Sequence, residues 1–272
     1  MSGLLKADFY RVLKSKLTMV ILILTVALPM VTSLLFSLMR WIFSMPGDDF
    51  TQELGILSAN SLLESVFSLA NNIGLVIPAF AGIMVCADIS NGTLRNKVIC
   101  GNRRWQIYLS HLLVSMVFCV VAILIYAGAT AGFAAIFLKY NKVELKTVIY
   151  WLIYGVTTFV YAATISTFLA MTFRSIAPTI IFTLLIALGL MSFTGLLSFM
   201  DTEKLKYLVY LIPTYSSSSM KLGGGITIAD LFGSPVTLSQ DTIFLEGILS
   251  FVLFGIVNTV LGMLIFRKKD IK

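Results

Sequence analysis

Charged residues are scarce in this sequence. Only 12% of its 272 residues are Asp, Glu, Lys or Arg, whereas an ordinary soluble domain is about one-quarter charged. A water-soluble fold of this composition would have too few polar side chains to cover its surface. The apolar residues instead fall in runs longer than the roughly 18 residues that cross the hydrocarbon core of a bilayer. The sequence therefore excludes a soluble domain and predicts a membrane protein.

Enzyme signatures are also missing. The sequence has no GxxxxGK[ST] phosphate loop and no HExxH or GxSxG motif. Its single histidine, His111, lies in an apolar segment, where packing or hydrogen bonding is the expected role. The cysteines Cys86, Cys100 and Cys119 lack the spacing of a metal site, so we expect free thiols. We therefore expect no catalytic residue, cofactor or metal in this chain, and any energy must come from a partner or an ion gradient.

Long uncharged segments predict an all-α membrane protein that forms one domain over residues 1–272, with six transmembrane helices. The six segments are residues 17–39, 65–87, 105–138, 147–173, 175–200 and 247–266. At about 1.5 Å per residue, the third would be longer than a hydrocarbon core of about 30 Å. We therefore expect this helix either to extend beyond the membrane or to be broken.

The N-terminal segment, residues 1–16, combines apolar and basic residues. Leu4, Phe9 and Leu13 lie near one helical stripe, with Lys6 and Lys14 mostly elsewhere. This pattern favours an amphipathic helix on the membrane surface. A basic flank that only orients the first span is the alternative.

The segment between the fifth and sixth spans, residues 201–246, is irregular. Its apolar pieces are too short to cross a bilayer and too apolar for a solvated loop. We expect short re-entrant helices in the outer leaflet, with a disordered external loop as the alternative.

The distribution of charge predicts the orientation. With both termini inside, the cytoplasmic segments hold 13 of the 20 Lys and Arg residues and three of the 13 acidic ones. This bias agrees with the positive-inside rule. We therefore expect a multi-pass protein of the bacterial inner membrane with both termini in the cytoplasm. The net charge of +7 is a topology signal and does not indicate nucleic-acid binding.

Residues 88–104 connect the second and third predicted spans and have the most specific pattern. An acidic residue ends the span, a Gly-Thr pair follows, and a glycine precedes the basic residues at the start of the next span. We single out eight positions: Asp88, Gly92, Thr93, Arg95, Lys97, Gly101, Arg103 and Arg104. This pattern resembles the connection between spans two and three in permeases of type-2 ABC transporters, with Asp88 where glutamate is more usual.

The resemblance covers essentially the whole chain and implies a function. Residues 88–104 would form the coupling helix, with Arg95, Lys97, Arg103 and Arg104 facing the ATPase or lipid head groups. The alternative is that these charges only fix the topology. Two copies of a cytoplasmic ABC ATPase would supply ATP and magnesium chemistry, and a second identical or related permease would complete an exporter. Membrane lipids are the remaining expected partner.

Polar residues at membrane depth are few. Asn71, Asn72, Thr157 and Thr164 are candidates for a substrate path, although hydrogen bonding between helices is the favoured interpretation. So few buried charges suit an apolar or amphipathic cargo such as a peptide, a lipid-like molecule or a drug. An ATP-independent secondary transporter or channel is the rival function. It would predict internal repeats and ionisable groups near the midplane, and the sequence has neither.

One further motif concerns packing. Gly128 and Gly132 form a GxxxG pair in a stretch of small residues. Such a pair lets another helix approach closely. The sequence leaves open whether that helix belongs to this chain or to a second copy.

Overall fold

The computed structural model describes residues 2–43, 59–67, 72–138, 145–198 and 240–268. All regular secondary structure in these ranges is α-helical. The helices are α1 (Ser2–Lys14), α2 (Lys16–Phe43), α4 (Ala59–Val66), α5 (Asn72–Ser90), α6 (Thr93–Ile99), α7 (Arg104–Phe137), α8 (Leu145–Phe173), α9 (Ile176–Ser198) and α13 (Gln240–Lys268).

Several of these helices are long and apolar enough to cross a membrane. Four pass this test alone: Lys16–Met39 of α2, all of α7, all of α8 and Gly247–Lys268 of α13. Gly74–Ser90 of α5 and α6 pass it together, although they are bent by 63°. The described part of α9 adds a shorter apolar stretch, Ile176–Gly189. The chain is therefore an all-helical, multi-pass membrane protein with four or five candidate spans among the described residues.

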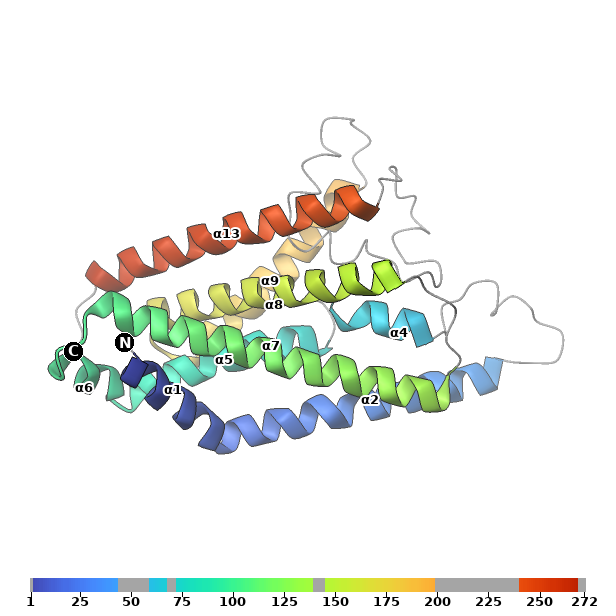
Figure 1. The fold of residues 1–272 in the computed structure, drawn as a ribbon, viewed down its shortest axis with the longest axis horizontal. Helices are drawn as coiled ribbons and strands as arrows, with labels where there is room; N and C mark the ends of the chain where they lie inside the picture. The colour runs from blue at the N-terminus through green and yellow to red at the C-terminus, as the bar shows by residue number, and fades with distance from the viewer. Residues whose placement is uncertain (1, 44–58, 68–71, 139–144, 199–239, 269–272) are drawn as a thin grey trace.

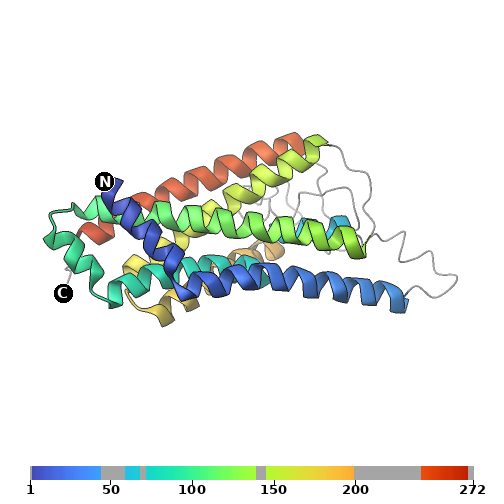
Figure 2. The ribbon, with the colours of Figure 1, turned by 60° about the horizontal axis from the view of Figure 1, so that its bottom comes forward.

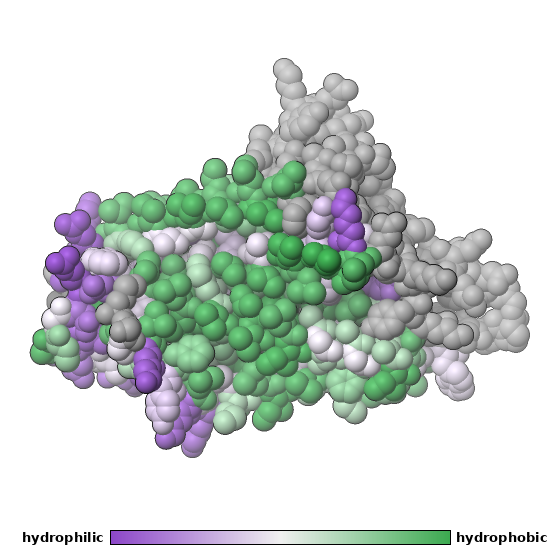
Figure 3. All heavy atoms as spheres, in the orientation of Figure 1, coloured by the Kyte–Doolittle hydropathy of each residue, from purple (hydrophilic) through white to green (hydrophobic). Residues whose placement is uncertain are grey.

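The long helices run side by side in a bundle (Figure 1). α7 packs against α2, α8, α4, α1, α5 and α13, and α8 packs against α13, α7, α5 and α9. The start of α1, the whole of α6 and the end of α13 gather at one end, which we call the α6 end (Figures 1 and 2). In the view of Figure 3, hydrophobic residues cover the length of the helices and hydrophilic residues gather at the α6 end.

Aromatic packing joins the short helix α4 to the bundle. The Phe67 ring, directly after α4, lies with its centroid 4.3 Å from that of Trp151. It also packs closely on Gly155 of α8, where an added Cβ would overlap the ring. Phe67 and its neighbours belong to the largest buried apolar cluster, which joins α2, α4, α5, α7 and α8.

The described helices overlap the six segments expected as spans, and their bounds differ clearly from the expected ones in two places. α7 is one unbroken helix of 34 residues, because it contains no proline or charge after its first residue. The segment expected at 65–87 is divided, since α4 ends at Val66 and α5 begins at Asn72. α13 begins at Gln240, before the expected position 247. Residues 201–239, with most of the expected re-entrant segment, lie outside the described residues.

Two packing expectations are clarified. A Cβ added at Gly128 or Gly132 would meet no atom within 4 Å, so this glycine face is not used for close packing among the described helices. In α1, Phe9 and Leu13 of the expected apolar stripe are exposed. The buried side of α1 instead carries a carboxylate, Asp8.

Candidate functional site at the α5–α6 elbow

At the α6 end the chain bends sharply between α5, α6 and α7. We call this segment, residues 88–104, the elbow. α5 ends at Ser90, and Gly92 has a φ of 69° before α6 starts. Gly101 has a φ of 85° between α6 and α7. A Cβ at either glycine would meet no atom within 4 Å, so glycine is needed here for the left-handed backbone conformation and not for space.

Buried contacts fix α6 on its inner side. Leu94 is 4% exposed and packs in an apolar cluster with Ile107, Tyr108 and Phe266. The hydroxyl of Thr93 donates to the backbone carbonyl of Asp88 over 2.7 Å. The short helix is therefore held against α5, α7 and α13.

A group of charged side chains completes the inner side of the elbow. The ammonium of Lys97 lies 2.5 Å from Oδ1 of Asp8, 3.7 Å from Oδ2 of Asp88 and 3.1 Å from Nε2 of His111. These residues come from α6, α1, α5 and α7. One α6 side chain therefore contacts three other helices.

A second cation supports the same arrangement. The guanidinium of Arg11 lies 2.7 Å from Oδ1 of Asp88 and donates to Oγ1 of Thr93 over 3.0 Å. The hydroxyl of Ser110 donates to Oδ2 of Asp8 over 2.6 Å. We call Asp8, Arg11, Asp88 and Lys97, with their neutral partners Thr93, Ser110 and His111, the charge cluster. Its two carboxylates balance its two cations.

The contacts of His111 specify its tautomer. An ammonium has no acceptor, so the 3.1 Å contact with Lys97 makes Nε2 of His111 the acceptor. The proton of the neutral ring is then on Nδ1, which lies 3.7 Å from Oδ2 of Asp88. The expectation that His111 serves hydrogen bonding agrees with this geometry.

Asp8 is the charged residue of α1 that is most buried, at 4% exposure. Burial alone would raise its pKa. The charge that His111 carries once it is protonated, the bonds from Lys97 and Ser110 and the charge of Lys97 together outweigh burial and lower the pKa below the usual 3.8. Asp8 is therefore a carboxylate at neutral pH, and it pairs with Lys97 as an ion.

Three residues of the charge cluster have the donor types of a metal site. Ligand atoms of Asp8, Asp88 and His111 all lie within 4.8 Å of one another. The ammonium of Lys97 already lies among them, at 3.7 Å or less from one atom of each. A divalent ion would add charge to a group that is already balanced, so the geometry favours an internal cation over a metal.

The outer side of the elbow has a different character. Arg95, Asn96 and Cys100 are exposed, and Ile99 is 73% exposed. Arg103 is exposed as well, with its backbone N–H donating to the Gln106 side chain. The outer side of the elbow therefore presents an exposed apolar side chain, Ile99, between the cations Arg95 and Arg103. The opposite side of α6 is held by buried contacts.

The eight elbow residues singled out in the sequence divide into two groups. Gly92, Arg95, Gly101 and Arg103 are exposed, whereas Asp88 and Thr93 face inward. The prediction that Lys97 faces outward is wrong, because its side chain is 13% exposed and pairs with two carboxylates.

Arg104 connects α7 to α13. Its Nη1 donates to the backbone carbonyl of Arg267 over 2.9 Å. This bond satisfies a carbonyl in the last turn of α13, where a helix has no backbone donor of its own. Arg104 therefore has a structural contact in addition to any contact with a partner or lipid.

Sequence reasoning missed the contribution of α1 to this site. Asp8 and Arg11 are three residues apart and therefore lie on one helical face. An acidic residue in an otherwise basic segment was the available signal. The identity of its partner, 89 residues away, has no signal in one sequence.

The candidate path residues lie elsewhere in the bundle. The hydroxyls of Thr157 and Thr164 donate to carbonyls of their own helix, those of Tyr154 and Tyr161. Asn72 begins α5, but its side chain lies outside the described residues, as does Asn71. Of these four side chains, the structure describes those of Thr157 and Thr164, and both bond within α8.

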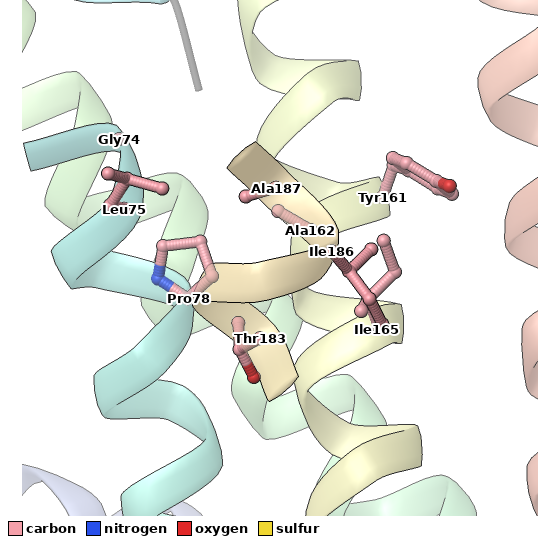
Figure 4. A pocket seen from close by; sticks show the side chains of 9 residues that line it. All are labelled: Gly74, Leu75, Pro78, Tyr161, Ala162, Ile165, Thr183, Ile186 and Ala187. Carbon is pink, nitrogen blue, oxygen red and sulfur yellow. The ribbon is translucent and has the colours of Figure 1, made fainter. Parts of the chain in front are cut away.

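A small apolar cavity lies where α5, α8 and α9 meet (Figure 4). Pro78 of α5, Ile165 of α8 and Ile186 of α9 each contribute to its wall. Thr183 also lines it, with its hydroxyl donating to the carbonyl of Thr179 over 2.7 Å. The wall of this cavity is almost entirely hydrocarbon.

Comparison with known proteins gives a family. No curated protein matches the sequence. One family model matches residues 19–272, which includes most of α2, the elbow and the later described helices. This match covers far more than half of the chain. The chain therefore belongs to the family described as "Protein of unknown function (DUF2705)".

Proposed function

We propose that this chain is the membrane-spanning permease subunit of an ATP-driven ABC transporter of the type-2 class, and that a separately encoded ATPase docks on the elbow. One observation carries the proposal. α6 is anchored by buried groups on one side and presents Arg95 and Ile99 on the other. A partner that engaged this outer side would act on α5 and α7 directly.

The anchoring of α6 suits force transmission. Packed helices move as rigid bodies when a short element seated in a partner is displaced. Leu94 and Thr93 hold α6 to α7 and α5. Lys97 adds an ion pair with Asp88 of α5 and a hydrogen bond to His111 of α7. Closure of an ATPase around α6 would therefore displace the membrane helices.

The proposal includes an orientation and a span count. α2, α4 with α5, α7, α8, α9 and α13 would be the six spans, and the α6 end would be cytoplasmic. This orientation puts Lys6, Arg95, Arg103 and Arg267 on the cytoplasmic side of a bacterial inner membrane, as the positive-inside rule requires. Residues 201–239, which precede α13, would form the outer, re-entrant segment.

An apolar or amphipathic cargo is proposed for the transporter, moving outward. The cavity between α5, α8 and α9 supports this cargo class, because hydrocarbon forms nearly all of its wall. Ten residues of α5 separate Pro78 from Asp88, which corresponds to about 15 Å of helix, or roughly the middle of a bilayer. A path through Thr157 and Thr164 of α8 would pass beside this cavity.

The working assembly would contain two permeases and two ATPases, with ATP and magnesium bound by the ATPases. The second permease would be identical to this chain or related to it. The glycine face at Gly128 and Gly132 is open among the described residues, and is one surface on which a second permease could pack.

Photo-crosslinking in native membranes tests the docking site. A photoreactive phenylalanine at Arg95 on the outer side of α6 should capture an ATPase with a phosphate loop. The same group at Tyr10, which is 64% exposed on α1, is a position off the elbow and should give much less of that product. Equal capture at both positions would contradict docking on the elbow. Solute transport by the purified chain alone in liposomes would favour a secondary transporter or channel.

A further inference from the structure

The bonds of the charge cluster connect α1 to the elbow. Asp8 contacts Lys97 and Ser110, and Arg11 contacts Asp88 and Thr93. α1 therefore has polar bonds to α5, α6 and α7. No covalent connection holds α1 there, because the chain reaches α5 only after the whole of α2 and α4.

The arrangement depends on charge balance. Asp8 and Asp88 face Lys97 and Arg11, and all but Arg11 have side chains at most 13% exposed. Removing one partner of a buried ion pair leaves an uncompensated charge, which is far worse than removing both. The contact between α1 and the elbow is therefore stable only while the cluster stays balanced.

α1 also continues into the membrane through a hydrogen-bonded joint. The backbone N–H of Ser15 donates to the carbonyl of Val12, and the N–H of Met19 donates to the carbonyl of Ser15. The hydroxyl of Thr18 donates to the same Val12 carbonyl over 2.5 Å. A displacement of α1 would therefore reach α2, which packs along α7.

We propose that the charge cluster is a latch that makes α1 and α6 one mechanical unit, so that load on α6 reaches α2 through α1 as well as α5 and α7 directly. Lys97 is the central residue of the latch, because its ammonium contacts α1, α5 and α7. The latch stands on the contacts of this chain alone. Its use in transport rests on the proposed function.

Amide hydrogen exchange of the full chain in lipid nanodiscs tests the latch without any ATPase. Asp8→Asn leaves two cations with one carboxylate, and Lys97→Met leaves two carboxylates with one cation. Each should speed exchange in α1 by about tenfold or more. The double variant keeps the balanced pair of Arg11 and Asp88, so its exchange should lie closer to that of the original chain than either single variant.

A matched control is Lys6→Gln, which removes an exposed cation from the same helix and should leave exchange in α1 unchanged. Unchanged exchange in both single variants would overturn the latch. Additive effects in the double variant would overturn the role of charge balance, because lost packing alone predicts additivity.

The second arm uses the complex of this chain with its co-purified ATPase. A non-hydrolysable ATP analogue should change exchange in α1 and α6 together in the original complex, and in α6 alone in Asp8→Asn. If exchange changed in α6 alone in both the original complex and Asp8→Asn, transmission through α1 would be overturned, although the latch itself would not be. If no ATPase co-purifies, both the proposed function and transmission through α1 are contradicted. The exchange experiment on the chain alone still tests whether the latch exists.

Discussion

The ammonium of Lys97 on α6 lies 2.5 Å from the carboxylate of Asp8 on α1, a contact that spans 89 positions of the sequence. Both side chains are nearly buried at the α6 end of the bundle. The same ammonium also contacts Asp88 of α5 and His111 of α7. The inner side of α6 is therefore held by three other helices, and its outer side is exposed. Its exposed face is therefore suited to take force from a partner.

Gly92 and Gly101 should resist substitution for a backbone reason. Gly92→Ala or Gly101→Ala would place an alanine at positive φ and cost about 1 to 2 kcal/mol of stability, since the left-handed conformation disfavours a Cβ. Gly128→Ala is the matched control, because its Cβ also meets open space but in ordinary helix. Thermal unfolding in detergent should show losses for the elbow variants and none for the control. Equal melting temperatures for all three would contradict the assigned backbone strain.

Removal of the Tyr108 hydroxyl should stabilise the protein. The hydroxyl is buried without a hydrogen-bond partner in the described part of the chain and lies against Gly262 of α13. Tyr108→Phe removes a buried unsatisfied group, whose desolvation costs about 1 to 3 kcal/mol, so the melting temperature should rise. Gly262→Ala should lower it, because the new Cβ would overlap Tyr108. A melting temperature lowered by Tyr108→Phe would indicate a partner for this hydroxyl.

Some of the features behind these predictions can be predicted from the sequence, and others cannot. The apolar run between Trp105 and Leu138 was enough to locate α7, because a stretch without charge or proline has few alternatives to a helix in a membrane. The division at Val66 and Asn72 was not found, since the run from 65 to 87 is uniformly uncharged. The turn at Gly92 was visible as a glycine pattern. The pairing of Asp8 with Lys97 was not, because single sequences contain no signal for contacts between distant segments.

Docking of α1 should be insensitive to pH near neutrality. The pKa of Asp8 is lowered by its partners, so its contribution to stability is complete above its unfolded value of about 3.8 and is lost as the pH falls through the lower folded value. A fluorophore on Tyr10→Cys, in a chain with Cys100→Ser, should show constant polarity from about pH 5 to pH 8. A transition within that window would show that one of the two carboxylates of the cluster, Asp8 or Asp88, titrates there, and it would contradict the assigned ion pairs.

The native cysteines report the orientation. Cys100 is exposed at the α6 end, whereas Cys86 and Cys119 are buried. A thiol reagent that cannot cross membranes should label Cys100 in inverted inner-membrane vesicles and not in intact spheroplasts. Cys100→Ser should abolish the labelling, which identifies the reactive thiol. Labelling from the outer side would reverse the proposed orientation.

Co-purification is the most direct test of docking on the elbow. The tagged chain is purified from native membranes in mild detergent, and its partners are quantified by mass spectrometry. Ile99→Ser changes a 73% exposed residue on the elbow, and Ile136→Ser changes a 72% exposed residue near the end of α7 farthest from the elbow. We predict that a phosphate-loop ATPase co-purifies at equal stoichiometry with the original chain and with Ile136→Ser, and is lost with Ile99→Ser. Absence of any ATPase from the original chain in several detergents, or retention by Ile99→Ser, would contradict the account.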